Sequence, residues 1–143
     1  MRSDKENELY LIKSGHSNNL MLDATDSDQV KIQPFSGSNV QLWKCVRASR
    51  AGYFYIINHN TGKALDYHYR PNQQNKYLLK TAPLCTSTNS TQEFVINKNG
   101  RITNVYTGEN IDIVDAQYRP GISVQLWADN GNQAQQFTLQ KRT

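Results

Sequence analysis

Three aspartates stand in apolar surroundings along the chain, and their carboxylates are the side chains best suited to chemistry. Asp23, Asp66 and Asp112 each follow a leucine or an isoleucine, and they recur at intervals of roughly 45 residues. Paired carboxylates can act as general acid and base, but these three belong to separate segments, so we expect them to lie too far apart. The sequence also has no phosphate-binding loop and no His-Glu-x-x-His motif. These observations favour binding over catalysis, with carboxylates that accept hydrogen bonds.

Cysteine and histidine spacing argues against a metal site. Cys45 and Cys85 form no Cys-x-x-Cys motif, and His16, His59 and His68 do not complete a metal-binding spacing with them. We therefore expect no metal and no cofactor.

Each aspartate belongs to a repeated unit that also contains a turn and an aromatic residue. The units close on a glutamine, a spacer and a large aromatic residue: Gln41-Leu42-Trp43, Gln92-Glu93-Phe94 and Gln135-Gln136-Phe137. Four residues before each aspartate is a residue suited to a left-handed turn, in the pairs Asn18-Asn19, Thr61-Gly62 and Thr107-Gly108. Strand-like runs precede these pairs at 9–12, 53–57 and 101–106.

These patterns predict an all-β fold of three similar units. Each unit would contain four short strands, with boundaries near residues 7–48, 49–97 and 98–143, and no long segment shows helical periodicity. A unit of this size cannot bury its own face, whereas three copies around a pseudo-threefold axis can. Within a single domain spanning 1–143, the closing aromatics would fill a shared core and the repeated glutamines would be structural.

The three glutamine-aromatic motifs, in register with three turn-and-aspartate motifs, resemble those of the ricin B-type β-trefoil lectins. The resemblance covers nearly the whole chain. Its most specific parts run from Gln41-Leu42-Trp43 through 52–57 to 61–66, and from 124–127 to Gln135-Gln136-Phe137. It implies a β-trefoil fold and a lectin without catalytic activity, which binds sugars in up to three shallow pockets, one in each unit.

The resemblance also implies a division of labour within each pocket. In the family, the aspartate accepts hydrogen bonds from two vicinal hydroxyls, and an aromatic ring on the third strand stacks on the apolar face of the sugar. An Asn or Gln near the last strand completes the polar contacts. Carboxylates and rings are physically suited to these roles. The implied ligand is galactose or N-acetylgalactosamine, bound weakly at each site and more strongly through repeated sites.

The third unit matches the family pattern best. Asp112 takes the aspartate position, and strand alternation in Val124-Gln125-Leu126-Trp127 places Gln125 and Trp127 outward. We expect the Asp112 and Trp127 side chains to be largely exposed, so that replacing either would hardly change the melting temperature.

The polar residue expected near the last strand of this unit departs from the family pattern. Ala134 stands where the family has an asparagine, so Asn132 or Gln133 is expected to substitute for it. Tyr118, in the loop after Asp112, is a further candidate for lining the pocket.

The first and second units retain fewer of the expected groups. The first has Asp23 and a well-placed Asn39, but Gln33 falls where the aromatic platform should be. The second has Asp66 but no aromatic ring at the platform position. A tyrosine of the 67–69 cluster, such as Tyr67, would have to replace that ring. The same cluster could instead be a packed loop that covers the barrel end.

The net charge and the hydropathy of the chain limit the classes of binding partner. The net charge is +4 without a run of Lys or Arg, which argues against nucleic acid. No stretch approaches 18 apolar residues, so we expect no membrane span. The expected partners are glycans, namely galactosides on glycoproteins or glycolipids, and a homodimer is one assembly that would multiply the sites. The first residues lack an apolar signal region, so we expect a cytoplasmic protein or release by a route that needs no signal peptide.

Two other functions fit a trefoil. A protease inhibitor would need one rigid exposed loop, for which 67–76 and 85–91 are candidates, but such trefoils usually lack glutamine-aromatic repeats. The receptor-binding component of a toxin would need a separate catalytic partner. Because disulfides in the lectin family join positions within one unit, and Cys45 and Cys85 lie in different units, we expect two free thiols.

Overall fold

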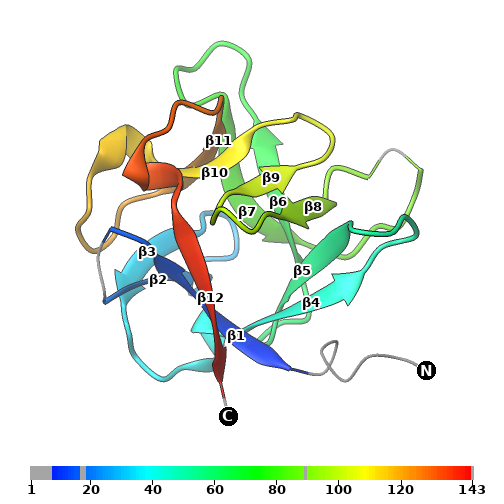
Figure 1. The fold of residues 1–143 in the computed structure, drawn as a ribbon, viewed down its shortest axis with the longest axis horizontal. Helices are drawn as coiled ribbons and strands as arrows, with labels where there is room; N and C mark the ends of the chain where they lie inside the picture. Colours follow the sequence, from blue (N-terminus) through cyan, green and yellow to red (C-terminus); the bar gives the residue numbers. More distant parts are fainter. Residues whose placement is uncertain (1–7, 17–18, 89, 143) are drawn as a thin grey trace.

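The computed structural model describes residues 8–16, 19–88 and 90–142, and in them the chain forms an all-β β-trefoil (Figure 1). Asn18 of the first predicted turn and the N-terminal segment 1–7 lie outside the described residues. The strands are β1 (Leu9–Ser14), β2 (Leu20–Asp23), β3 (Lys31–Pro34), β4 (Trp43–Arg47), β5 (Phe54–Asn58), β6 (Ala64–Tyr69), β7 (Tyr77–Ala82), β8 (Phe94–Ile96), β9 (Ile102–Asn104), β10 (Asn110–Ile113), β11 (Val124–Trp127) and β12 (Phe137–Arg142).

Six strands form a barrel and six form three hairpins beside it. The barrel strands pair antiparallel in the order β12, β1, β4, β5, β8 and β9. The hairpins are β2–β3, β6–β7 and β10–β11. Neighbouring hairpins are joined by Gln125 opposite Leu78 and by a bridge between Lys31 and Ser123. Each aspartate lies in a hairpin strand, so the barrel and its hairpins together determine where the carboxylates lie.

The closing aromatics of the three units meet in one core, as the repeat predicts. Trp43 and Phe94 are fully buried and Phe137 almost so, and all three belong to the same apolar cluster. The Trp43 indole also donates a hydrogen bond to the carbonyl of Leu22 at 3.2 Å. These contacts link the last strand of each unit to the shared interior.

A buried glutamine–aspartate pair recurs in every unit. The Nε2 atoms of Gln41, Gln92 and Gln135 donate to Oδ2 of Asp23, Asp66 and Asp112 at 2.9, 3.0 and 2.9 Å. Each Nε2 donates a second hydrogen bond to a nearby backbone carbonyl, that of Pro34, Pro83 or Ala128. Each pair therefore ties the second strand of its unit to the segment just before the fourth strand.

Both cysteines are free thiols, as expected, but their surroundings differ. Cys45 is half-buried on β4, and burial raises its pKa to about 12. Cys85 is exposed, and hydrogen bonds with the hydroxyl and backbone of Ser87 lower its pKa. Among the described residues, no helix is long and apolar enough to span a membrane.

The two thiols should therefore react at different rates. Since the thiolate is the nucleophile, iodoacetamide at pH 8 should modify Cys85 rapidly in the folded protein and Cys45 only after denaturant is added. Peptide mass mapping over time measures both rates. If neither cysteine takes up label in denaturant without a reductant, the two thiols are not free.

Replacing Gln41 by leucine should destabilise the fold through the first glutamine–aspartate pair. The change removes the bonds to Asp23 and Pro34, and it leaves the backbone amide of Ser36 without its Gln41 acceptor. The expected loss in the free energy of unfolding is about 3 kcal/mol, measured by urea denaturation. Asn39→Ala, at an exposed side chain two residues earlier, is the matched control and should stay within about 0.5 kcal/mol of the parent. Equal losses in the two variants would contradict the assignment.

Candidate functional site

The third hairpin forms a pocket around Asp112. In the β10–β11 ladder, Asp112 lies opposite Gln125, and Asn110 lies opposite Trp127. The pocket encloses about 260 Å³, and Asp112, Gln125, Trp127 and Asn132 all line it. The structure thus brings together four of the residues that the sequence pattern selects for this unit.

Asp112 is buried, contrary to the expectation of an exposed side chain: the residue retains only 4 % of its accessible surface. Its Oδ1 accepts from Gln125 Nε2 at 3.1 Å and its Oδ2 from Gln135 Nε2 at 2.9 Å. Burial raises the pKa of the Asp112 carboxyl, and these two hydrogen bonds act in the opposite direction. A substitution here should therefore cost stability, contrary to the expectation from sequence. Trp127 does remain accessible, at 38 %.

Gln125 differs from the expected outward orientation as well. Strand alternation suggested an exposed side chain, but Gln125 is 4 % exposed because Asn75 covers it. Its Nε2 donates to Asp112, while its Oε1 accepts from Asn75 Nδ2 at 3.0 Å. Asn75 comes from the loop between β6 and β7, so a neighbouring unit helps to build this pocket.

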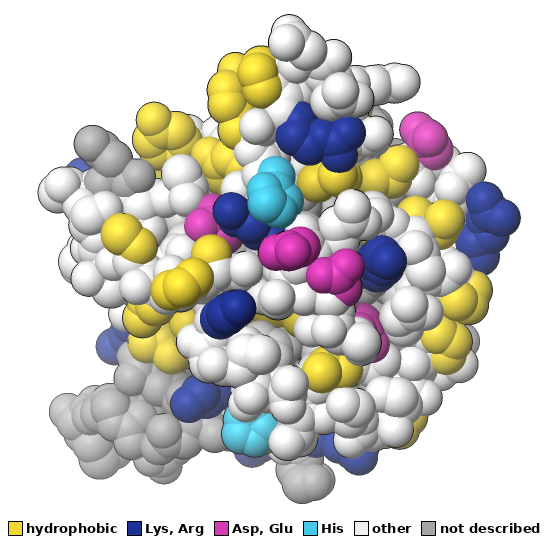
Figure 2. All heavy atoms as spheres, turned by 180° about the vertical axis from the view of Figure 1, so that it is seen from behind, with side chains coloured by type: hydrophobic (Ala, Val, Ile, Leu, Met, Phe, Trp, Pro, Cys, Tyr) yellow, Lys and Arg dark blue, Asp and Glu magenta, His cyan; other side chains and the backbone are white. Residues whose placement is uncertain are grey.

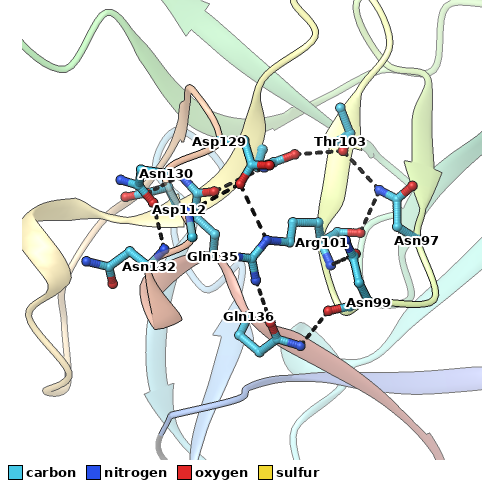
Figure 3. Close-up of polar contacts among 12 residues, drawn as sticks. Asn97, Asn99, Arg101, Thr103, Asp112, Asp129, Asn130, Asn132, Gln135 and Gln136 are labelled. Atoms are coloured by element: carbon cyan, nitrogen blue, oxygen red, sulfur yellow. Dashed lines mark hydrogen bonds and ion pairs between the residues drawn. The ribbon is translucent and has the colours of Figure 1, made fainter.

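A chain of hydrogen-bonded polar side chains leads away from Asp112 Oδ2 (Figure 3). Gln135 donates to Asp112 and accepts from Asn110 Nδ2 at 3.0 Å. Asn110 in turn accepts from the Thr103 hydroxyl at 2.7 Å, and Thr103 accepts from Asn97 Nδ2 at 3.0 Å. Because an ionised carboxylate can only accept, it determines the orientation of each amide along this chain. All four bonds point toward Asp112.

An ion pair holds the loop that follows β11. Arg101 lies 3.6 Å from Asp129 and also donates to Gln136, as Figure 3 shows. The same loop carries Asn130 and Asn132, which line the pocket. The ion pair therefore connects this pocket-lining loop to Arg101, which directly precedes β9.

Of the other candidates of the third unit, Asn132 lines the pocket, whereas Tyr118 and Gln133 lie outside it. Asn132 Oδ1 accepts from Ala134 N at 2.8 Å and from the Tyr118 hydroxyl at 3.2 Å, and its Nδ2 has no partner among the described residues. Tyr118 stacks on His16 with centroids 3.7 Å apart, outside the set of lining residues. Gln133, on the short 3-10 helix η4 (Gln133–Gln135), is exposed and also outside that set.

Asp23 and Asp66 are held differently from Asp112. Asp23 Oδ1 accepts from the backbone amide of Thr25 at 2.8 Å. Asp66 Oδ1 accepts from the amide of Tyr67 at 2.8 Å and from the Thr91 hydroxyl at 2.7 Å. Both carboxylates are buried, and local backbone groups occupy the oxygen that in Asp112 faces a side-chain amide.

The other predicted residues of these two units do not form a sugar platform. Asn39 is exposed on the 3-10 helix η2 (Asn39–Gln41). Tyr67 is 9 % exposed and packs edge-on against Tyr77 in the core, and burial raises its pKa to about 12. The sequence interpretation of Tyr67 as a platform is therefore wrong. Tyr69, which is exposed, stacks on Tyr77 instead.

Several lining residues have no signal in the sequence pattern. Gln74 and Asn75 come from the second unit, and only the pairing of β7 with β11 brings them to Asp112. Asp115 and Ala116 follow β10 with φ of 55° and 53°, a left-handed conformation that aspartate adopts more often than most residue types but that alanine rarely adopts.

Basic side chains do not gather into one patch on the face seen in Figure 2. They are scattered there among acidic and uncharged polar groups. This distribution matches the absence of Lys or Arg runs in the sequence.

Comparison with known proteins places these features in a family. Residues 8–137 match the ricin-type beta-trefoil lectin domain. No curated protein sequence matches the chain.

Solved structures share the fold at low sequence identity. A designed three-fold symmetric protein, ThreeFoil, has a TM-score of 0.78 at 22 % identity, over 92 % of this chain and 96 % of its own. A ricin B-like lectin from Macrolepiota procera in complex with lactose has a TM-score of 0.75 at 18 % identity, over 99 % and 100 %. The C-half of an earthworm R-type lectin in complex with GalNAc has a TM-score of 0.73 at 16 % identity, over 94 % and 99 %. The chain spans less than half the length of two other matched chains, one of them from a mosquitocidal holotoxin.

Proposed function

Because the chain belongs to the ricin-type β-trefoil lectin family, we propose that it binds a galactose or N-acetylgalactosamine unit in the Asp112 pocket and catalyses no reaction. The observation that carries the proposal is the pairing of a buried carboxylate with an exposed indole in one hollow. The lactose and GalNAc complexes of two structural neighbours support this choice of sugar.

Asp112 has acceptor capacity left for a ligand. An ionised carboxylate offers about four lone-pair sites, and Asp112 uses one on each oxygen for Gln125 and Gln135. Two vicinal hydroxyls can donate to the remaining sites. Since both protein donors are amides of side chains, the carboxylate keeps its place without a backbone turn closing over it.

Trp127 and Asn132 complete the recognition. The exposed Trp127 ring supplies a flat apolar surface for the C–H face of a pyranose. The Asn132 Nδ2 group, which has no partner among the described residues, can donate to a sugar oxygen. Gln125 carries out a positioning role, because it holds Asp112 while Asn75 holds Gln125.

Trp127→Ala should abolish stacking and weaken binding about tenfold. Stacking is worth about 1–2 kcal/mol, and a millimolar site has only about −4 kcal/mol in total. The melting temperature should hardly move, because the ring is exposed. Calorimetric titration with galactose and N-acetylgalactosamine measures the effect. Phe35→Ala, which removes another exposed ring, is the control and should bind like the parent.

Two of the three buried aspartates, Asp112 and Asp23, offer a matched comparison. Asp112→Asn and Asp23→Asn each disturb a glutamine–aspartate pair, so both should lower the melting temperature to a similar degree. Only Asp112→Asn should lose sugar binding in the same titration. If Asp23→Asn loses binding and Asp112→Asn retains it, the site lies in the first unit. If the parent binds no sugar on a glycan array, the lectin proposal is wrong.

Sugar affinity should also fall in acid. Hydroxyls donate to the ionised carboxylate, so a proton on Asp112 competes with the ligand. Because burial raises the Asp112 pKa above the ordinary 3.8, affinity should be constant near neutral pH and decline before the pH reaches that value. Titrations at successive pH values, with circular dichroism to show that the protein stays folded, test this. A folded protein with undiminished affinity at pH 3.8 would contradict the role of Asp112.

A further inference from the structure

A second hollow lies next to the Asp112 pocket, on the same indole. It encloses about 390 Å³, and Lys76, Tyr77, Glu109 and the stretch 126–128 line it. Trp127 and Gln74 line both hollows. We call this second one the Glu109 hollow.

Strand register explains why these residues meet. Trp127 ends β11 opposite Asn110, the residue after Glu109. On its other side β11 pairs with β7 through Gln125 and Leu78, and β7 begins directly after Lys76. The ends of three adjacent strands therefore surround Trp127, which stands between an acidic and a basic side chain.

The Glu109 carboxylate is prepared to accept a hydrogen bond. It is half-buried, and no described residue donates to its side chain. Its burial raises its pKa, and the nearby Lys76 ammonium partly opposes that effect. Because the carboxylate is only half-buried and no described residue donates to it, a ligand hydroxyl in this hollow would gain a hydrogen bond that the protein does not supply.

Volume and charge indicate the kind of occupant. Small-molecule sites usually enclose about 300–1,000 Å³, and the Asp112 pocket alone, at about 260 Å³, falls below that range. The charges of Lys76 and Glu109 offset each other. Together they provide one donor group and one acceptor group beside an aromatic wall formed by Tyr77 and Trp127, which suits an uncharged sugar ring.

We propose that the Glu109 hollow binds the second unit of an uncharged galactose-containing oligosaccharide whose terminal unit occupies the Asp112 pocket. Trp127 then stands between the two units, and Glu109 and Lys76 hydrogen-bond to hydroxyls of the second. This inference rests on the proposed sugar site at Asp112. The residues at the strand ends around Trp127 then select the glycosidic linkage and the second sugar.

The test compares one sugar with two. Methyl β-galactoside and a panel of galactose-terminated disaccharides, lactose and N-acetyllactosamine among them, are titrated against the parent, Glu109→Gln and Glu93→Gln. Glu93 is a half-buried glutamate of the second unit that accepts from the Tyr55 hydroxyl, so its variant is the matched control. At least one disaccharide should bind the parent about tenfold more tightly than methyl β-galactoside. Glu109→Gln should remove most of that advantage without changing the affinity for methyl β-galactoside, and Glu93→Gln should preserve it.

Amide chemical shifts provide a second measurement that does not depend on a variant. The disaccharide should perturb the Glu109 and Ala128 amides, whereas methyl β-galactoside should perturb mainly those of Asp112 and Asn132. If no disaccharide exceeds the monosaccharide, or if the advantage survives in Glu109→Gln, the Glu109 hollow is not a sugar site although the Asp112 pocket stands. If none of these galactosides binds the parent, this inference fails, and if N-acetylgalactosamine does not bind it either, the proposed function fails as well.

Discussion

The hydrogen bond between a buried glutamine and a buried aspartate is the interaction on which this trefoil depends. It occurs three times, at 2.9–3.0 Å, and each time the same amide nitrogen also reaches a backbone carbonyl. A buried carboxylate is unfavourable unless it is paired and hydrogen-bonded, so each unit must close its last segment onto its second strand. The Gln-x-aromatic motif thus joins two tasks, since the aromatic enters the core while the glutamine satisfies the aspartate.

What distinguishes the third unit is the kind of donor on the second carboxylate oxygen. In Asp23 and Asp66 that oxygen accepts from a nearby backbone amide, which turns the carboxylate toward its own loop. In Asp112 it accepts from Gln125, which a loop of the second unit supports. The glutamine–aspartate pair therefore only stabilises the fold in the first two units. In the third unit it also forms the floor of a pocket.

Sequence alone predicted the features that depend on repetition. The spacing of the aspartates and the Gln-x-aromatic motifs was enough for three units around a shared aromatic core, and the family resemblance that these motifs carry implied the trefoil and the meeting of Asp112, Trp127 and Asn132. It was not enough for the burial of Asp112 and Gln125, because alternation along a strand does not show which side chains a neighbouring loop will cover. The prediction of Tyr67 as an aromatic platform was wrong for a related reason, since the packing of Tyr67 against Tyr77 depends on how two strands pair. Contacts between units are absent from a pattern that describes each unit separately.

The pairing of β12 with β1 has a consequence for how the chain acquires its structure. Leu9 lies opposite Arg142 and Ser14 opposite Phe137, so the first strand finds this neighbour only in the last one (Figure 1). During synthesis that edge of β1 has no partner until β12 has emerged from the ribosome. Contacts of such long sequence separation slow folding because loop closure must precede them, and an unpaired edge is open to association with other chains. In the interval between the synthesis of β1 and that of β12, the unpaired edge of β1 therefore exposes this protein to misassembly.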